Sequence, residues 1–185
     1  MDNALWAFGR VSGFVSLALF TAAVVLGILT RSGRPLFAIP RFSVTLIHRN
    51  ISLLATVFLI LHVGSLMLDS FAKLNVIDVF VPFLGAFKPF WQGLGTVAFD
   101  LVLAVVATGL LRHRIGQKSF RAVHWLTYAM WPIALAHAIG NGTNGTAGWF
   151  LLLAVGAVAA VGAAVVWRLS ATFLETSKAR QGGLS

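Results

Sequence analysis

Four of the five histidines lie inside long apolar stretches, where an imidazole side chain is costly and needs a partner. His48 and His62 are 14 residues apart, and His124 and His137 are 13 residues apart. On an α-helix each separation corresponds to about 20 Å along the axis. If the two helices run in the same direction, His48 and His124 share one depth, and His62 and His137 share another. The spacing therefore predicts two cross-helix histidine pairs stacked through a membrane.

Two such pairs fit the axial ligands of two bis-histidine haems, because a porphyrin supplies its own nitrogens and needs only two ligands from the protein. A single zinc or copper site would gather all four imidazoles within a few ångströms, which the predicted separation excludes. The chain has no cysteine, which excludes thiolate metal sites and covalent c-type haem attachment. With both axial positions filled, outer-sphere electron transfer is the expected chemistry. The ordinary alternative for any one histidine is a hydrogen bond between packed helices.

The elements that must position these histidines are strongly apolar. Of the 185 residues, 58% are hydrophobic and 10% are charged, whereas soluble domains average about 45–50% and about 25%. Five stretches are long enough for a helix that crosses a bilayer: 11–30, 44–68, 93–111, 120–139 and 149–169. We therefore predict an all-α integral membrane bundle of about five transmembrane helices. Residues 1–185 would form a single transmembrane haem domain, with haems between the second and fourth helices and a polar cytoplasmic tail at 170–185.

The two histidines of each helix are predicted to lie at suitable depths, but the spacing does not point both of them to the same face of the helix. A step of 14 residues returns to within about 40° of the same face, whereas 13 residues miss it by about 140°. Pro132 lies between His124 and His137, and a proline inside a helix permits a kink. Such a kink is one way to re-aim His137.

The formal net charge of +9 is unevenly distributed. Eleven of the 14 Lys and Arg residues fall in the predicted loops 31–49 and 112–121 and in the C-terminal part from Arg168 onward, all on one side of the predicted bundle. Because basic residues favour cytoplasmic loops, we predict a plasma-membrane protein with an external N-terminus and a cytoplasmic C-terminus, and no nucleic acid as a partner. On the other side, residues 69–92 are predicted to hold a short amphipathic piece in the membrane interface, broken by Pro82 and Pro89.

A few charged residues are candidates for roles beyond topology. Three arginines near the predicted inner pair can bind haem carboxylates or, alternatively, lipid phosphates: Arg41, Arg49 and Arg121. Lys88 on the outer side is a candidate for attracting an anionic electron acceptor, the alternative being a lysine that snorkels to the interface. Asp100, the only acid inside a predicted helix core, either couples proton movement or hydrogen-bonds to Thr108 or Ser65.

Several short motifs resemble those of one membrane family. They are Arg10-Val11-Ser12-Gly13, Leu46-Ile47-His48-Arg49-Asn50, Gly93-Leu94-Gly95, Leu110-Leu111-Arg112, Arg121-Ala122-Val123-His124-Trp125, Gly142-Thr143-Asn144 and Gly148-Trp149. Over roughly residues 6–169 the chain resembles the ferric reductase-like transmembrane domain, most closely its short actinobacterial members. Ferric reductases, NADPH oxidases and the haem subunit of bacterial methionine sulfoxide reductase share this domain. The resemblance implies two haem b groups, one between His48 and His124 and one between His62 and His137. Family members usually have six helices, one more than predicted here.

The resemblance and the topology together imply electron transfer from a cytoplasmic or inner-leaflet donor to an outer acceptor, as in an oxidoreductase of the ferric reductase type. No flavin or nicotinamide site is expected, because the run from Gly140 to Gly145 fits G-x-G-x-x-G but follows an apolar helix and not a strand. The expected donor is therefore a separate flavoprotein or a membrane quinol. The expected acceptor is a ferric chelate, oxygen or superoxide, or a redox protein. The alternatives are a non-catalytic haem-binding anchor subunit of a larger redox complex, and a haemless membrane scaffold or channel.

Overall fold

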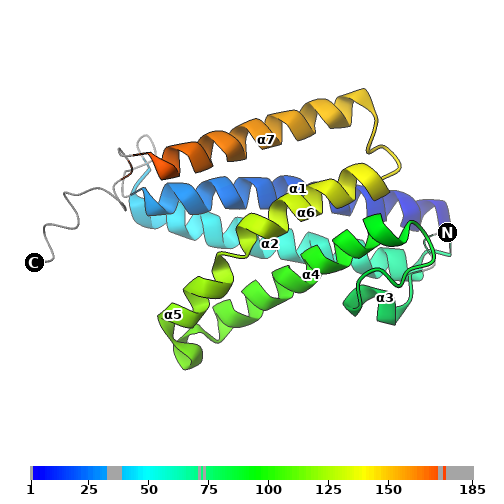
Figure 1. Cartoon of the computed structure of the whole chain (residues 1–185), viewed down its shortest axis with the longest axis horizontal. Coiled ribbons are helices and arrows are strands. Elements are labelled where there is room, and N and C mark those ends of the chain that lie inside the picture. Colours follow the sequence, from blue (N-terminus) through cyan, green and yellow to red (C-terminus); the bar gives the residue numbers. More distant parts are fainter. Residues whose placement is uncertain (1, 33–38, 71, 73, 171–172, 174–185) are drawn as a thin grey trace, which may run out of the picture.

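The computed structural model describes residues 2–32, 39–70, 72, 74–170 and 173, most of them in helices (Figure 1). In chain order the helices are α1 (Asp2–Arg31), α2 (Arg41–Leu68), α3 (Val76–Phe80), α4 (Pro89–Leu110), α5 (Arg112–His124), α6 (Thr127–Asn141) and α7 (Gly148–Leu169). Within the described part of the chain, four helices are long and apolar enough to span a membrane: α1, α2, α4 and α7. The protein is therefore an all-α membrane bundle, as its composition predicts.

The fourth apolar stretch departs from the single helix predicted over 120–139. It is divided between the end of α5 and α6, which has 15 residues and is shorter than the ~20 residues of a spanning helix. At the division, the N–H of Leu126 bonds to the carbonyl of Val123, and that of Tyr128 bonds to Trp125. These three-residue steps form a tight, 3₁₀-like turn. Hydropathy marks the apolar run but not these local bonds, and the turn precedes Pro132, which lies inside α6.

Residues 112–121, predicted as a loop, form most of α5. Arginine, lysine and glutamine favour helix, and Gly116 bends the element with a φ of 82°. None of the α5 side chains is buried, so the basic residues are exposed at one end of the bundle, here called the α5 end. Charge places these residues outside the apolar layer but does not decide whether they are helical, which is why the loop prediction is wrong.

The opposite end of the bundle, here called the α3 end, contains the described residues between 69 and 92. The backbone N–H of Asn75 caps α3 by donating to Oδ2 of Asp78 at 3.0 Å. Thr96 Oγ1 donates to the carbonyl of Asp78 at 2.7 Å and so ties α3 to α4. Helix α3 ends before Pro82, and Pro89 is the first residue of α4. A proline fits this position because the helix needs no N–H there.

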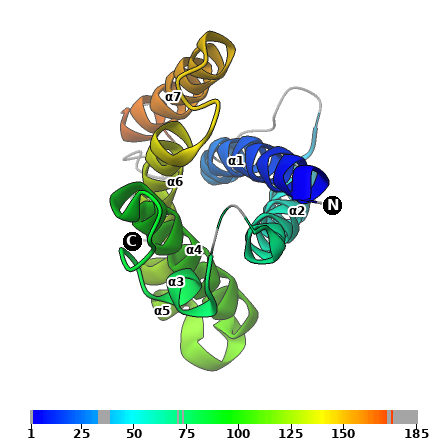
Figure 2. The same cartoon turned by 90° about the vertical axis from the view of Figure 1, so that its right-hand side faces the viewer.

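Two groups of helices make up the bundle (Figures 1 and 2): α1 lies antiparallel to α2 in one, and α4 lies antiparallel to α6 in the other, where α5 packs on α4. Helix α1 joins the groups because it contacts α6 and α7 as well as α2. One link is a hydrogen bond from Trp131 Nε1 on α6 to Thr21 Oγ1 on α1, 2.9 Å long. The buried core lies around this link and includes Phe20, Ala55, Ala98, Val102, Met130, Trp131 and Leu135.

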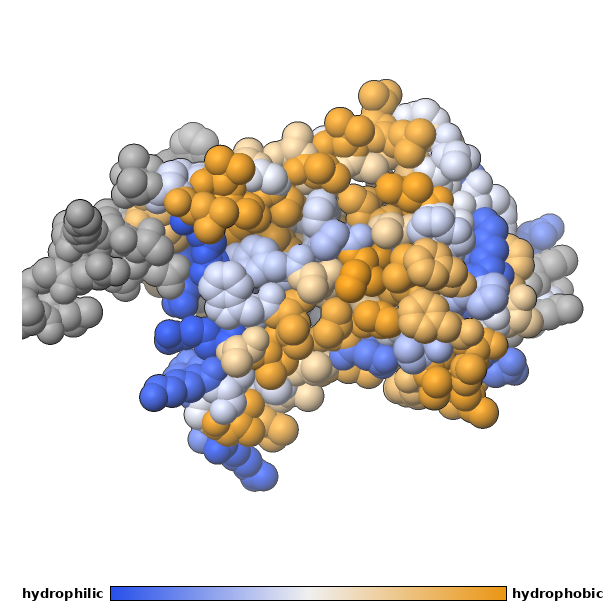
Figure 3. Space-filling view, in the orientation of Figure 1, coloured by the Kyte–Doolittle hydropathy of each residue, from blue (hydrophilic) through white to orange (hydrophobic). Residues whose placement is uncertain are grey.

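The surface is apolar over the middle of the bundle. Figure 3 shows hydrophobic residues over the central part of one face and hydrophilic residues gathered toward the two ends. On α7, the side chains of Leu152, Val155 and Val166 are 75%, 67% and 70% exposed. Exposed apolar side chains in this number suit contact with lipid tails, in which every backbone group must be bonded within its own helix.

Candidate functional site

His48 on α2 and His124 at the end of α5 lie together toward the α5 end. Their ring centroids are 6.3 Å apart, and the rings are perpendicular with an interplanar angle of 90°. Two imidazole nitrogens bound to opposite sides of one metal ion, each at ~2 Å, place their ring centroids roughly 6 Å apart. The distance between these two rings is therefore compatible with two ligands of one metal ion.

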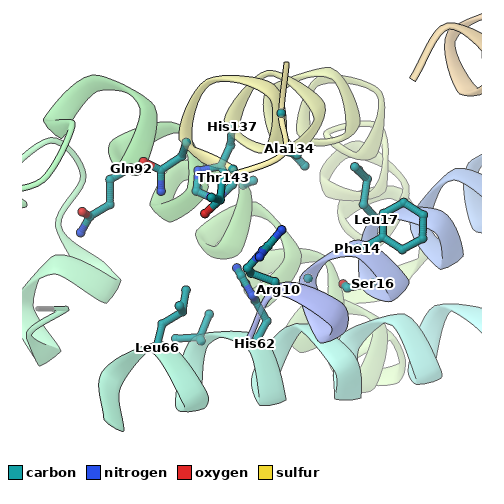
Figure 4. A pocket seen from close by; sticks show the side chains of 18 of the residues that line it. Arg10, Phe14, Ser16, Leu17, His62, Leu66, Gln92, Ala134, His137 and Thr143 are labelled. Carbon is teal, nitrogen blue, oxygen red and sulfur yellow. The ribbon is translucent and has the colours of Figure 1, made fainter. Parts of the chain in front are cut away.

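His62 on α2 and His137 on α6 lie toward the α3 end and line one cavity (Figure 4). The cavity has a volume of about 1040 Å³, at the upper end of the ~300–1,000 Å³ typical of ligand pockets. Side chains of α1, α2, α4 and α6 form its walls. The two histidines come from different helix groups, so a ligand bound between them would contact both groups.

Backbone carbonyls of neighbouring helices hold three of the four imidazoles. The Nδ1 atoms bond to the carbonyl oxygens as follows: His48 to Ala23 at 2.9 Å, His62 to Gly9 at 2.7 Å, and His137 to Trp91 at 2.7 Å. A carbonyl oxygen can only accept a hydrogen bond, so each Nδ1 must carry the hydrogen. The neutral ring then presents the lone pair of Nε2, which is the form that binds a metal.

A glycine follows each of these carbonyls by four residues and lies against the same ring. A Cβ atom built on the glycine would lie very close to the imidazole: 3.2 Å from His48 at Gly27, 2.7 Å from His62 at Gly13, and 2.5 Å from His137 at Gly95. Helical side chains lean toward the N-terminus of their helix, so a side chain at this position would cover the carbonyl one turn earlier. Glycine leaves the carbonyl open to the histidine. We call each such carbonyl with its glycine a histidine cradle.

His124 differs from the other three histidines. Its Nδ1 is buried without a hydrogen-bond partner in the described part of the protein, and its ring centroid lies 5.2 Å from that of Phe120. Among the described residues, no three His, Asp or Glu side chains gather as ligands of one ion. The donor set is thus two pairs of imidazoles, which fits a cofactor that takes one ligand on each face.

A signal for the cradles exists in the sequence, although hydropathy and charge do not single out their glycines. Gly13 and Gly27 are 14 residues apart, as are His48 and His62. Because α1 and α2 are antiparallel neighbours, equal spacing brings each glycine to the level of one histidine. Matching the glycine spacing to the histidine spacing would have found this pair of positions.

Arg10 is a further residue of the cavity that the histidine spacing does not indicate. Its half-buried side chain lines the cavity close to His62 (Figure 4), with the guanidinium 4.2 Å from the centre of the Trp6 ring. Lys88 lines the same cavity and donates from Nζ to the carbonyl of Gly140 at 3.0 Å. The cavity is thus bordered by two cationic side chains from different helix groups.

Of the three arginines predicted to bind haem carboxylates, the two whose side chains are described do not line this cavity. Arg49 and Arg121 are exposed toward the α5 end, and the side chain of Arg41 lies outside the described residues. Two other arginines, Arg31 and Arg168, lie near enough to His124 to interact with it electrostatically. The guanidinium of Arg168 lies 4.5 Å from the ring of Trp125 and donates to the hydroxyl of Tyr128. Arg168 therefore ties the end of α7 to the turn that follows His124.

Asp100 lies half-buried on α4 and does not line the cavity. The hydroxyl of Thr108 donates to the carbonyl of Ala104 at 2.7 Å, and that of Ser65 donates to the carbonyl of His62 at 2.8 Å. Both hydroxyls that the sequence suggests as partners of Asp100 are thus bonded within their own helices.

Comparison with known proteins identifies the family. A family model described as the ferric reductase like transmembrane component matches residues 12–135 of the 185-residue chain. No curated protein and no solved structure matches the chain. The matched span includes His48, His62 and His124 and ends two residues before His137. Because the match covers well over half of the chain, the protein belongs to the family of ferric reductase-like transmembrane domains.

Proposed function

We propose that this protein transfers electrons across the plasma membrane with two haem b groups, one held by His48 and His124 and the other by His62 and His137. The observation that carries the proposal is the pairing of imidazoles from the two helix groups, three of them bonded through Nδ1 to a main-chain carbonyl. A neutral ring bonded in this way carries its hydrogen on Nδ1 and its lone pair on Nε2. Domains of this family generally bind haem, which supports the same cofactor. When bound, haem supplies a reversible one-electron carrier.

The cradles give the histidines their chemical form and their direction. The carbonyl keeps the hydrogen on Nδ1, and this bond also makes Nε2 a stronger donor to a metal. The glycine lets the ring approach the neighbouring helix, so the imidazole is oriented by the fold before a cofactor arrives. Held by two imidazoles, a haem would supply outer-sphere electron transfer and not oxygen chemistry at the metal.

Apolar side chains fill the space between the two histidine layers. His48 and His62 are 14 residues apart on α2, which is about 21 Å along the helix axis. Ala55 is midway between them, and Met130 and Trp131 occupy the middle level on α6; all three are buried. These side chains keep water out of the centre of the bundle, so that electrons can cross without a continuous path for ions.

We propose that the α5 end faces the cytoplasm and that the N-terminus lies outside. The support is the group of exposed basic side chains on α5, comprising Arg112, Arg114, Lys118 and Arg121, because basic residues favour the cytoplasmic side. With a membrane potential that is negative inside, outward movement of an electron is favoured by about 2.3 kcal/mol per 100 mV. The proposed direction is therefore from the α5 end to the α3 end.

The donor and the acceptor are proposed to be separate molecules. A flavoprotein or a membrane quinol would donate electrons at the α5 end, near His124. A ferric chelate, oxygen or superoxide, or a redox protein would accept them at the α3 end. Arg10 and Lys88 line the cavity on that side, where their charges can pair with carboxylates of the cofactor or with an anionic acceptor.

Haem content tests the proposal directly. The purified protein, produced with a supply of haem, should show a Soret band and two haems per chain by pyridine haemochrome. His48→Ala and His124→Ala should remove the same haem, identified by its electron paramagnetic resonance (EPR) signal, and His62→Ala and His137→Ala should remove the other. His113→Ala, at an exposed position of α5, is the control and should keep both. Absence of a Soret band from the wild type would overturn the proposal.

Electron transfer needs its own measurement. In liposomes that contain the protein and a trapped acceptor, an external reductant should reduce the acceptor, and each of the four histidine variants should slow this at least tenfold. A rate equal to that of protein-free liposomes would contradict the proposed function. Reoxidation of the haems by a partner protein, but by no soluble acceptor, would instead make the chain an anchor subunit of a larger redox complex.

A further inference from the structure

The three histidine cradles share one arrangement, and α4 contains the carbonyl and the glycine of this arrangement once more, without an imidazole bond. In each cradle a main-chain carbonyl accepts the ring N–H, and the residue four positions later is glycine. The fourth copy consists of the carbonyl of Val105 and of Gly109, toward the α5 end of α4. We propose that this is the cradle of His124, to which the imidazole donates its Nδ1 hydrogen when the inner haem is bound. The inference rests on the proposed haem function and adds a positioning site to it.

The cradles on α1 show how spacing and packing are related. Gly13 lies against His62, and Gly27 lies against His48. The glycines are 14 residues apart on α1, and the histidines are 14 residues apart on the antiparallel α2. The cradles on α1 are therefore spaced by the same number of residues as the histidines on α2.

Helix α4 carries the same interval. Gly95, which lies against His137, and Gly109 are 14 residues apart. Because α4 runs antiparallel to the chain from α5 to α6, a step from Gly95 to Gly109 corresponds to a step from His137 back toward His124. The histidines on this side are 13 residues apart, one fewer than the glycines. The 3₁₀-like turn after His124 can make up the difference in length, because a 3₁₀ turn rises more per residue than an α-helix.

The cradle of His62 also contains a hydroxyl. Ser12 directly precedes Gly13, and its Oγ donates to the carbonyl of Phe8 at 2.7 Å and to that of Gly9 at 3.0 Å. The carbonyl of Gly9 nevertheless accepts the bond from His62 at 2.7 Å. A hydroxyl bond to the cradle carbonyl is thus compatible with an imidazole bond.

The fourth copy repeats this hydroxyl on α4. Thr108 directly precedes Gly109, and its Oγ1 donates to the carbonyl of Ala104 at 2.7 Å and to that of Val105 at 3.2 Å. The shorter bond goes to the earlier carbonyl, as it does from Ser12. The carbonyl of Val105 therefore has the same local bonding as the one that already holds a histidine.

Phe120 now occupies the place beside Gly109. A Cβ atom built on Gly109 would lie 3.7 Å from Cε2 of Phe120, and Phe120 is one helical turn before His124, with the ring centroids 5.2 Å apart. The Nδ1 of His124 is meanwhile buried and unpaired within the described structure. If Phe120 moved away from Gly109, the carbonyl of Val105 would be open as an acceptor for this nitrogen. The segment that would have to move lies between two irregular points of the backbone, Gly116 and the turn at Trp125.

Substitution of Gly109 tests the proposal. Gly109→Leu would cover the carbonyl of Val105, so it should halve the haem content and remove the same EPR signal as His124→Ala. Gly156→Leu on α7 is the matched control, since nothing lies within 4 Å of its Cβ position, and it should keep both haems. Full haem content and both signals in Gly109→Leu would overturn the proposal.

A milder variant guards against a folding defect. In Gly109→Ala the new methyl group makes only an ordinary contact with Phe120, so the cofactor-free protein should unfold at the wild-type temperature. Loss of the Nδ1 bond should nevertheless weaken His124 as a donor and raise the reduction potential of the inner haem. An unchanged potential would contradict the fourth cradle.

A substitution of Phe120 tests whether its phenyl ring is needed at the inner site. Phe120→Ala should retain both haems, because the phenyl group leaves the cradle when the inner haem binds. Loss of the inner haem in this variant would make Phe120 part of the site and overturn the proposed movement of Phe120. If the wild type contains no haem, the proposed function fails. If the wild type contains two haems and the Gly109 variants are normal, only the fourth cradle fails.

Discussion

The imidazole of His62 on α2 donates its Nδ1 hydrogen to the main-chain carbonyl of Gly9 on α1, 2.7 Å away. The ring reaches this carbonyl because Gly13, one turn later, carries no side chain. The bond joins two neighbouring helices and at the same time fixes which nitrogen of the ring is free. Orientation of a metal ligand by such an outer partner is what sets its strength and direction.

Gly13→Ala is expected to displace His62. The new Cβ would lie 2.7 Å from Nδ1, and overpacking of this kind costs about 1–3 kcal/mol. Haem content should fall to about half and the unfolding temperature should drop, measured by pyridine haemochrome and by thermal unfolding in detergent. Gly64→Ala is the matched control, because nothing lies within 4 Å of its Cβ position. Full haem content with an unshifted spectrum in Gly13→Ala would argue against the cradle.

Removal of haem is expected to loosen the contact between the two helix groups. Each histidine pair takes one ring from either group, so a cofactor bound between them holds the groups together. A ligand at one hundred times its dissociation constant stabilises the folded state by about 2.7 kcal/mol. The cofactor-free protein should therefore unfold at a lower temperature and exchange amide hydrogens faster in α2 and α6. The double variant His48→Ala, His62→Ala should show no stabilisation by added haem, and equal unfolding temperatures for the loaded and cofactor-free wild type would contradict the model.

Arg10 is expected to strengthen binding at the outer pair. Hydrogen bonds to a charged group contribute about 1.5–3 kcal/mol, so Arg10→Gln should speed transfer of the outer haem to a haem-scavenging protein about tenfold or more. The transfer rate of Arg10→Lys should lie between those of the wild type and Arg10→Gln, because lysine keeps the positive charge but lacks the planar guanidinium. Arg114→Gln, at an exposed position of α5, is the control. Equal transfer rates for Arg10→Gln and the control would exclude this role.

The orientation in the membrane can be tested with single cysteines, because the chain has no cysteine of its own. Val76→Cys places a thiol at the exposed start of α3, and Lys118→Cys places one on the exposed surface of α5. In intact cells a membrane-impermeant maleimide should label Val76→Cys and should reach Lys118→Cys only after permeabilisation. The reverse pattern would invert the proposed direction of electron transfer.

The sequence is sufficient to predict the membrane bundle and the depth of each histidine. Hydropathy is a property of local composition, and helical rise converts the spacing of His48 and His62 into a distance along the axis. The unequal numbers of basic residues likewise indicate a topology without a three-dimensional structure. What these local properties could not indicate is the turn between α5 and α6, or the first-turn position of Pro89, because both depend on which backbone bonds are made.

Only the tertiary structure shows how the histidines are held. The partner of His62 is a carbonyl, which every residue possesses, so no side-chain pattern marks Gly9 as its acceptor. Gly13 and Gly27 repeat the spacing of the histidines, but the packing of α1 against α2 decides which carbonyl each glycine uncovers. The sequence likewise does not indicate that Arg10 lies beside His62, because this position depends on the approach of α1 to the cavity. The amino-acid sequence by itself therefore determines the type of the four side chains and their spacing along the helices. The packing of antiparallel helices decides their direction and their bonds, since contacts between helices join residues that are far apart in the chain.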